Sequence, residues 1–147
     1  WEQNGLQVTL ESTLDRAPVK MDRDQFARVL DNLLGNSWKY KTEKTGTAQF
    51  RLSSDGQNRV RLELADNGSG VAPDQLDRIF ESFYRTDRAR SHVSAGSGLG
   101  LAVVRKIVET MKGKIWAEAN QPRGLKICME FSLEENGNNG KNPDRGR

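Results

Sequence analysis

The sequence predicts an α+β fold, a two-layer α/β sandwich in which helices cover one face of a mixed, mostly antiparallel sheet. Short stretches of alternating apolar and polar residues indicate strands. Other stretches carry apolar residues at helical spacing. These elements do not follow the strict alternation of a parallel sheet, and the 147 residues suffice for one domain with a single core.

The first elements are a strand and a long helix. Leu6, Val8 and Leu10 alternate with polar residues and predict a half-buried strand. Asp22 is an N-cap residue and Gln25 completes a capping box, so a helix should run from there to about residue 40. Its apolar stripe consists of Phe26, Val29, Leu30, Leu33 and Leu34.

Four further strands are expected, in two hairpins. Each pair combines apolar residues in alternation with a turn sequence between the strands. In one of them, Val60, Leu62 and Leu64 share a face. The strands are expected at residues 48–53 and 59–66, around Asp55-Gly56, and at residues 115–119 and 126–133, around 121–124.

Two more helices are expected between these hairpins. A short one at residues 74–83 should turn its apolar residues inward, including Phe83. Another at residues 99–111 should end at Gly113 as its C-cap. Residues 85–97 have no apolar period and predict a loop.

Composition limits the classes of function. The net charge of +3 is small for this length and does not by itself indicate a nucleic-acid partner. Cys128 is the single cysteine, which excludes a disulfide framework or multi-cysteine zinc site and fits a reducing cytoplasm. No stretch is apolar enough to span a membrane. Because the chain starts with Trp1 rather than Met, we expect part of a longer protein, with one domain at residues 1–133 and a disordered tail at 134–147.

Two asparagines should lie on one face of the first helix. Asn32 and Asn36 are four residues apart, and Lys39 falls close to the same face. An amide oxygen is a hard ligand for Mg²⁺, and a lysine supplies a point charge for phosphate. These residues suit a triphosphate with its magnesium, although an ordinary solvated helix flank would have the same composition.

Asp66 ends a predicted strand in phase with Val60, so its carboxylate should point toward the core side of the sheet. An unpaired charge is costly there, and a bound donor such as the exocyclic amine of adenine would satisfy it. Gly68 and Gly70 would let the backbone approach a flat ring without a Cβ in the way. A tight turn after a strand would use the same residues.

A second glycine cluster, Gly96-Ser-Gly98-Leu99-Gly100, comes directly before an apolar helix. Free N–H groups and the positive end of the helix dipole make such a start an anion site. A flexible hinge would have the same composition. The chain contains neither G-x-x-x-x-G-K-[ST] nor G-x-G-x-x-G after a strand, which excludes two well-known phosphate loops.

In this order, the segments resemble the catalytic and ATP-binding domain of two-component sensor histidine kinases. That superfamily, with its Bergerat-type ATP site, also holds type II topoisomerases, mismatch-repair ATPases and heat-shock chaperones. The resemblance extends over about residues 6–133 and implies ATP between the helices and a lid. It rests on Asn32-Leu-Leu-Gly-Asn36-Ser-Trp-Lys39-Tyr40 (the N box), Asp66-Asn-Gly68-Ser-Gly70 (the first glycine box), Ile79-Phe-Glu-Ser-Phe83-Tyr84-Arg85 (the F box) and Gly96-Ser-Gly98-Leu99-Gly100-Leu (the second glycine box).

The resemblance implies ATP and Mg²⁺ as cofactors and a role for each matching residue. Asn36 would be the magnesium ligand, and Asp66 would accept a hydrogen bond from the adenine amine. Asn32, Lys39 and Arg85 would act at the phosphates as catalytic residues. The other nucleotide contacts would be Tyr40, Gly68, Gly70, Phe83, Gly96, Gly98, Leu99 and Gly100.

Asn32 bears on the type of reaction. Water-splitting relatives usually carry Glu at this position as the base, and an amide is a poor general base. The resemblance therefore implies transfer of the γ-phosphoryl group to a histidine on a separate dimerisation domain, which this chain lacks. His92, in the expected loop, should be a solvent-exposed lid residue rather than the acceptor. We expect Arg88 and Arg90, in the same loop, to be solvated or to contact phosphate.

The resemblance also implies partners and a location. They are the dimerisation domain and a response regulator, with no nucleic acid and no membrane contact by this part. The domain would be cytoplasmic, and the sequence leaves open whether its parent is anchored in the bacterial inner membrane. Two alternatives remain: a nucleotide-binding regulatory module that transfers nothing, and an anti-sigma-type serine kinase of the same fold.

Two positions depart from the family pattern. Ser37 stands where the family usually has Ala, and Trp38 where a smaller aliphatic residue is commoner. By helical spacing, Ser37 should join the buried stripe, whereas Trp38 should lie on the far side from Asn36. The departures therefore concern packing more than metal binding.

Overall fold

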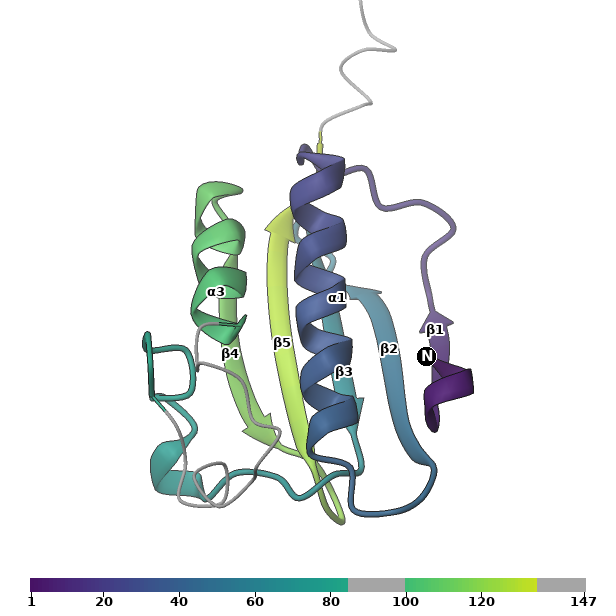
Figure 1. Cartoon of the computed structure of the whole chain (residues 1–147). Coiled ribbons are helices and arrows are strands. Elements are labelled where there is room, and N and C mark those ends of the chain that lie inside the picture. The colour runs from purple at the N-terminus through teal and green to yellow at the C-terminus, as the bar shows by residue number, and fades with distance from the viewer. Residues whose placement is uncertain (85–99, 135–147) are drawn as a thin grey trace, which may run out of the picture.

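The computed structural model describes residues 1–84 and 100–134. Two helices, α1 and α3, lie side by side across one face of a five-stranded sheet (Figure 1). This is the α+β sandwich expected from the sequence. The described elements are η1 (Glu2–Asn4), β1 (Leu6–Ser12), α1 (Arg23–Lys39), β2 (Gly46–Ser54), β3 (Arg59–Asp66), η2 (Pro73–Gln75), α3 (Gly100–Thr110), β4 (Lys114–Ala119) and β5 (Leu125–Ser132).

The strand order is β1-β2-β3-β5-β4. β1 pairs with β2 in parallel, and the other three pairs are antiparallel, so the prediction of a mixed, mostly antiparallel sheet is confirmed. Leu64 lies opposite Phe50 on one side and Ile127 on the other. The central strand β3 therefore carries its apolar residues into the middle of the sheet.

The core lies between the sheet and the two helices. Val29 and Leu33 of α1 are at most 1% exposed, and Val104 of α3 is fully buried. Opposite them, β3 buries Val60, Leu64 and Asp66, whereas the residues between these are only half-buried. These three residues and the partly buried Leu62, which packs against the core, share one side of β3, and this is the side toward which Asp66 points.

The ends of α1 follow the sequence prediction. The Asp22 carboxylate accepts hydrogen bonds from the backbone N–H groups of Asp24 and Gln25, at 2.9 and 3.1 Å. This satisfies two of the donors that a helix start leaves free. The return bond from the Gln25 side chain is not present among the described residues. Tyr40 forms the C-cap, as the expected end of the helix required. Neither α1 nor any other helix in the described part of the chain is long and apolar enough to cross a membrane.

The prediction of a short helix at residues 74–83 is wrong. Pro73 opens the single 3-10 turn η2, and the chain continues in turns in which Arg78 N–H bonds to Gln75 O and Glu81 N–H to Arg78 O. Bonds that reach back three residues wind the chain more tightly than an α-helix does. Phe83 then has a φ of 64° and is 69% exposed, so its ring does not point inward as expected.

Two smaller expectations are also wrong. Leu10 is 69% exposed because β1 is an edge strand, and α1 and α3 lie over the other strands (Figure 1). At the end of α3 the left-handed residue is Lys112, with a φ of 59°, rather than Gly113. Gly113 donates its N–H to Val108 O, and a Cβ on it would stand 2.7 Å from the Phe131 ring. Gly113 is therefore needed for packing, not for a left-handed cap.

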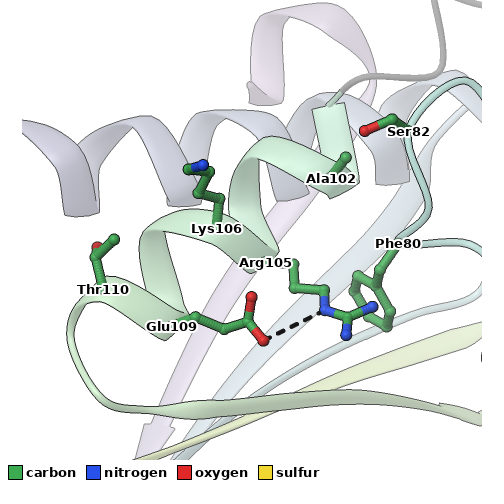
Figure 2. A pocket seen from close by; sticks show the side chains of 7 residues that line it. All are labelled: Phe80, Ser82, Ala102, Arg105, Lys106, Glu109 and Thr110. Carbon is green, nitrogen blue, oxygen red and sulfur yellow. Dashed lines mark ion pairs between the residues drawn. The ribbon is translucent and has the colours of Figure 1, made fainter.

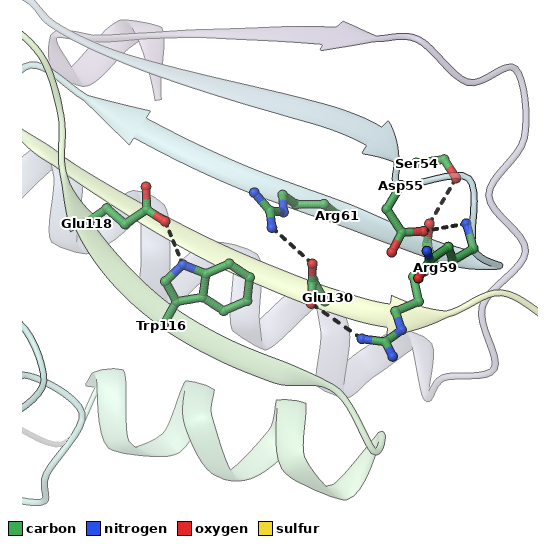
Figure 3. Close-up of polar contacts among 8 residues, drawn as sticks. Ser54, Asp55, Arg59, Arg61, Trp116, Glu118 and Glu130 are labelled. Carbon is green, nitrogen blue, oxygen red and sulfur yellow. Dashed lines mark hydrogen bonds and ion pairs between the residues drawn. The ribbon is translucent and has the colours of Figure 1, made fainter.

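The other face of the sheet carries polar side chains that pair across strands (Figure 3). Glu130 of β5 forms ion pairs with Arg61 at 3.1 Å and Arg59 at 3.9 Å. The Arg61 guanidinium also lies 5.0 Å from the centre of the Trp116 ring. Cys128 pairs in register with Trp116 on this face and is fully buried.

Cys128 is expected to be unreactive in the folded protein. Burial raises the pKa of its thiol from 9.0 to about 12, so at pH 9 its thiolate fraction is roughly 500-fold lower than that of a free cysteine. Modification by a chromogenic disulfide reagent should therefore be slow in buffer and fast in denaturant. Because Cys128 is the single cysteine, all of the colour released comes from this residue. Rapid modification of the native protein would contradict its burial.

Candidate functional site

The candidate residues come together at one end of the sheet. The C-terminal end of α1, the end of β3 and the turn between β4 and β5 lie at the lower end in Figure 1, and α3 begins higher, beside the middle of α1. Three of these segments contact one another directly at Asp66, which ends β3. The fold thus brings together the N box, the first glycine box and Gly100 of the second glycine box.

Asp66 is a buried carboxylate held by three donors. It is 7% exposed, and its Oδ1 accepts from the backbone N–H groups of Gly68 and Leu125, at 3.0 and 3.1 Å. Its Oδ2 accepts from the Ser37 hydroxyl at 3.0 Å. Burial raises the pKa of the Asp66 carboxyl above its ordinary value, and these bonds oppose part of that rise. The prediction that strand phase turns Asp66 inward is confirmed.

The backbone beside Asp66 is fixed by two residues that sequence reasoning did not single out. The Asn120 amide donates to Asp66 O at 2.8 Å. Gly124 has a φ of 110°, and a Cβ on it would overlap Asp66 O, which no side chain could tolerate. A glycine in an expected hairpin turn was a signal for tight backbone geometry, but nothing in the sequence indicated which strand the turn would contact.

Gly68 and Gly70 are needed for close approach of backbone to backbone. A Cβ on Gly68 would stand 2.6 Å from Tyr40 O, which accepts a hydrogen bond from Ser69 N–H at 2.9 Å. Gly70 has a φ of 71°, and its Cβ would lie 3.0 Å from Gly124 O. The first glycine box is thus docked on the end of α1 and on the β4–β5 turn.

The N box places its two asparagines differently. Asn36 is half-buried, and its amide has no hydrogen-bond partner within residues 1–84 and 100–134. The Asn32 amide donates to Arg28 O at 2.9 Å, and its Oδ1 would lie 3.3 Å from a Cβ on Gly100. The N box and the second glycine box therefore meet at Asn32. Lys39 is half-buried at the end of the same helix.

The family departures at residues 37 and 38 are placed as expected, but one has a polar role. Trp38 is 38% exposed and donates its indole N–H to Asn4 O at 2.7 Å. Ser37 is 3% exposed, in the buried stripe. Its hydroxyl bonds Asp66, a contact between distant parts of the chain that helical spacing alone does not reveal.

Several expectations fall on residues that the structure does not describe. Phe83 is described and exposed, but Arg85, which follows it in the F box, is not. The loop expected at 85–97, the start of the helix at residue 99 and the tail at 135–147 also lie outside the described residues. The residues concerned are Arg85, Arg88, Arg90, His92, Gly96, Gly98 and Leu99.

A separate groove of about 410 Å³ lies beside α3 (Figure 2). Phe80 and Ser82 line one side, and α3 contributes the other, where Arg105 pairs with Glu109 at 3.5 Å. None of the expected nucleotide residues lines this groove. It is therefore not the nucleotide site that the sequence predicts, and Ala102, Lys106 and Thr110 complete its lining.

The family of the chain is decided by a direct match. Residues 21–135 match the model of the family described as histidine kinase-, DNA gyrase B-, and HSP90-like ATPase. The chain belongs to this ATPase family. ATP is accordingly the substrate expected of this family.

Histidine kinases are among the similar proteins. The chain is 43% identical over 120 residues to the signal transduction histidine-protein kinase BaeS of Escherichia coli, covering 82% of this chain and 25% of BaeS. It is 36% identical over 118 residues to the sensor protein kinase WalK of Staphylococcus haemolyticus, covering 79% of this chain and 19% of WalK. The chain thus spans a quarter or less of the length of these curated relatives.

Solved structures of histidine kinases share the fold. The mycobacterial sensor histidine kinase MprB superposes with a TM-score of 0.73 at 25% identity, over 90% of this chain and 85% of that one. The nucleotide-free catalytic domain of histidine kinase ThkA gives 0.72 at 27% identity, over 90% and 83%. A complex of ThkA with the response regulator TrrA gives 0.70 at 25% identity, over 90% of this chain and 36% of that one.

Proposed function

We propose that this chain is the catalytic, ATP-binding part of a sensor histidine kinase in two-component signal transduction. It would transfer the γ-phosphoryl group of ATP to a histidine on a separate dimerisation domain. The observation that carries the proposal is the neutral amide of Asn32, which lies on the N box helix against Gly100 and donates to Arg28 O. An amide in this position cannot act as the base for water, which favours positioning and transfer over hydrolysis.

The nucleotide base would bind at Asp66. Its carboxylate is buried with its oxygens already directed by three donors, so it can accept one more hydrogen bond, from the adenine amine. Tyr40, Gly68 and Gly70 lie around it and would line the base. Asp66 would thereby be matched to a donor on the base, not to an acceptor.

The phosphates would lie toward Asn36 and Lys39. No cluster of three or more His, Cys, Asp or Glu side chains suited to a metal is present in the described part of the chain. The site nevertheless fits Mg²⁺, which is commonly held by one or two protein oxygens together with substrate phosphates. Asn36 Oδ1 would be such a ligand, and a bound Mg²⁺ would neutralise phosphate charge. Asn32 and Lys39 would orient the phosphates.

The remaining expected contacts stay proposals. They would complete the nucleotide site from the F box and the second glycine box, and they comprise Phe83, Arg85, Gly96, Gly98, Leu99 and Gly100. A response regulator is proposed as the downstream partner, by analogy with the ThkA complex. We also propose a cytoplasmic location, with one domain at residues 1–133.

The proposal is tested by supplying the missing acceptor. The chain is incubated with γ-labelled ATP, Mg²⁺ and the separately expressed dimerisation domain of its parent protein. We expect acid-labile, base-stable label on that domain, as for phosphohistidine. Acid-stable label on a serine would indicate a serine kinase instead, and ATP binding without any transfer would indicate a regulatory module.

A further inference from the structure

Ser37 occupies a position on α1 that faces the sheet rather than solvent. It is 3% exposed, and it directly follows the proposed magnesium ligand Asn36 along the helix. Its hydroxyl donates to Asp66 Oδ2 at 3.0 Å, across 29 positions of sequence. A buried hydroxyl bonded to a buried carboxylate links the N box to the first glycine box through side chains alone.

The bond from Ser37 determines how many acceptor positions of the Asp66 carboxylate remain free for a ligand. An ionised carboxylate can accept about four hydrogen bonds, two on each oxygen. Oδ1 already accepts from Gly68 N–H and Leu125 N–H. Oδ2 accepts from Ser37, so its second lone pair is the acceptor that remains for a ligand. The Ser37 hydroxyl thereby fixes both the orientation of Oδ2 and its role as an acceptor.

We propose that Ser37 is a positioning residue that makes Asp66 select a base with an amine, as in adenine, over a base with a carbonyl, as in guanine. The inference rests on the proposed function, in which Asp66 receives the base. It concerns discrimination between nucleotides, beyond the binding of ATP itself.

The selectivity follows from the two protonation states of the carboxyl group. An ionised Asp66 accepts from an amine and repels a carbonyl oxygen, whereas a protonated one would donate to a carbonyl. Burial favours the protonated form, and the Ser37 bond opposes it. Charged side chains on the surrounding segments are bonded elsewhere: Arg123 to Glu43 at 2.7 Å, and Lys41 to backbone oxygens. Lys39 shares α1 with Ser37, two residues further along, and would act at the phosphates.

The test compares three substitutions with three nucleotides. Ser37→Ala removes the hydroxyl, Ser37→Cys keeps the size with a much weaker donor, and Ser37→Thr keeps the hydroxyl. Dissociation constants are measured for ATP, for GTP and for purine riboside triphosphate, which lacks the 6-amino group. Thermal unfolding of each variant, without nucleotide, shows whether the fold is retained.

We expect Ser37→Ala and Ser37→Cys to weaken ATP binding roughly tenfold, since a hydrogen bond that supports a charged acceptor is lost. Binding of the amine-free analogue should change less than about twofold, because it does not use Oδ2. In both variants the ratio of ATP affinity to GTP affinity should become smaller. Ser37→Thr, which keeps the hydroxyl, should retain most of the wild-type ratio.

The possible outcomes distinguish the role of Ser37 from the role of Asp66. Equal weakening for ATP and the analogue would mean that Ser37 acts only through packing, which overturns the inference. Unchanged ATP affinity in Ser37→Ala would overturn it too. If the wild-type chain binds ATP and the analogue equally well, then Asp66 does not receive the amine. The base site of the proposed function is then wrong, and the role of Ser37 falls with it.

Discussion

Asp66→Asn should lower the affinity for ATP by at least about 100-fold while leaving the fold intact. The substitution keeps the shape, and the remaining oxygen can still accept from Gly68 and Leu125. The new NH₂ group would replace Oδ2. The Ser37 hydroxyl can rotate to accept from it, but the amine of adenine cannot, so a donor meets a donor at the ligand. A site built to hydrogen-bond its ligand rejects a mismatched group strongly, because buried polar groups are left unpaired. Titration calorimetry with ATP measures the loss.

The stability of the Asp66→Asn protein distinguishes loss of function from loss of fold. Burial raises the folded-state pKa of Asp66, so the carboxyl holds its proton more tightly in the folded than in the unfolded chain. The stability due to this proton is complete below about pH 3.8 and is lost as pH rises through the raised pKa. Above the raised pKa, the wild-type carboxylate is ionised and carries a desolvation cost, which the neutral amide of the Asp66→Asn protein avoids.

Urea unfolding across pH should therefore show the Asp66→Asn protein at least as stable as wild type at neutral pH. As pH rises from about 3.8 through the raised pKa of Asp66, the wild-type chain should lose stability relative to the Asp66→Asn protein. Asp55→Asn is the matched control, because Asp55 lies in the exposed turn before β3, at the opposite end of that strand. It should leave ATP affinity within about twofold. A destabilised Asp66→Asn protein, or one that binds ATP normally, would contradict the role of Asp66.

The sequence could predict those elements and orientations that neighbouring residues along the chain determine. Asp22 caps α1 by its own side chain, and alternation along β3 turns Asp66 inward, so both follow from neighbouring residues. The family boxes similarly indicated which segments would form the site. The domain limits and the roles of the site residues stay predictions.

What sequence reasoning missed depends on contacts between distant segments. The short helix at 74–83 was expected from apolar spacing, but spacing does not distinguish bonds to the third residue from bonds to the fourth. Leu10 continued the alternation of β1, yet its exposure depends on which strands the helices cover, and β1 is an edge strand outside them (Figure 1). The hydrogen bond between Ser37 and Asp66 joins a helix to a strand. Likewise, residue 124 must be glycine because the backbone oxygen of Asp66, in β3, lies against it.

Asn36→Ala should abolish the magnesium-dependent part of ATP binding. Within the described residues the Asn36 amide has no hydrogen-bond partner, so its removal leaves none of their polar groups unsatisfied and should cost little stability. Loss of a metal ligand removes both an oxygen from Mg²⁺ and a tether for the phosphates. We expect affinity for ATP to fall at least about 50-fold with Mg²⁺ present, and to change little when the metal is chelated.

Gln25→Ala is the matched control for Asn36→Ala. Gln25 is an exposed amide at the other end of α1, and its backbone N–H rather than its side chain bonds Asp22. It should leave ATP affinity unchanged with and without Mg²⁺. The comparison isolates the metal because binding of the base at Asp66 contributes equally in both proteins. If Asn36→Ala lost affinity equally with and without Mg²⁺, Asn36 would contact the nucleotide directly. If its affinity and phosphoryl transfer were unchanged with Mg²⁺ present, the metal-ligand role would be wrong, and another oxygen would have to hold the ion.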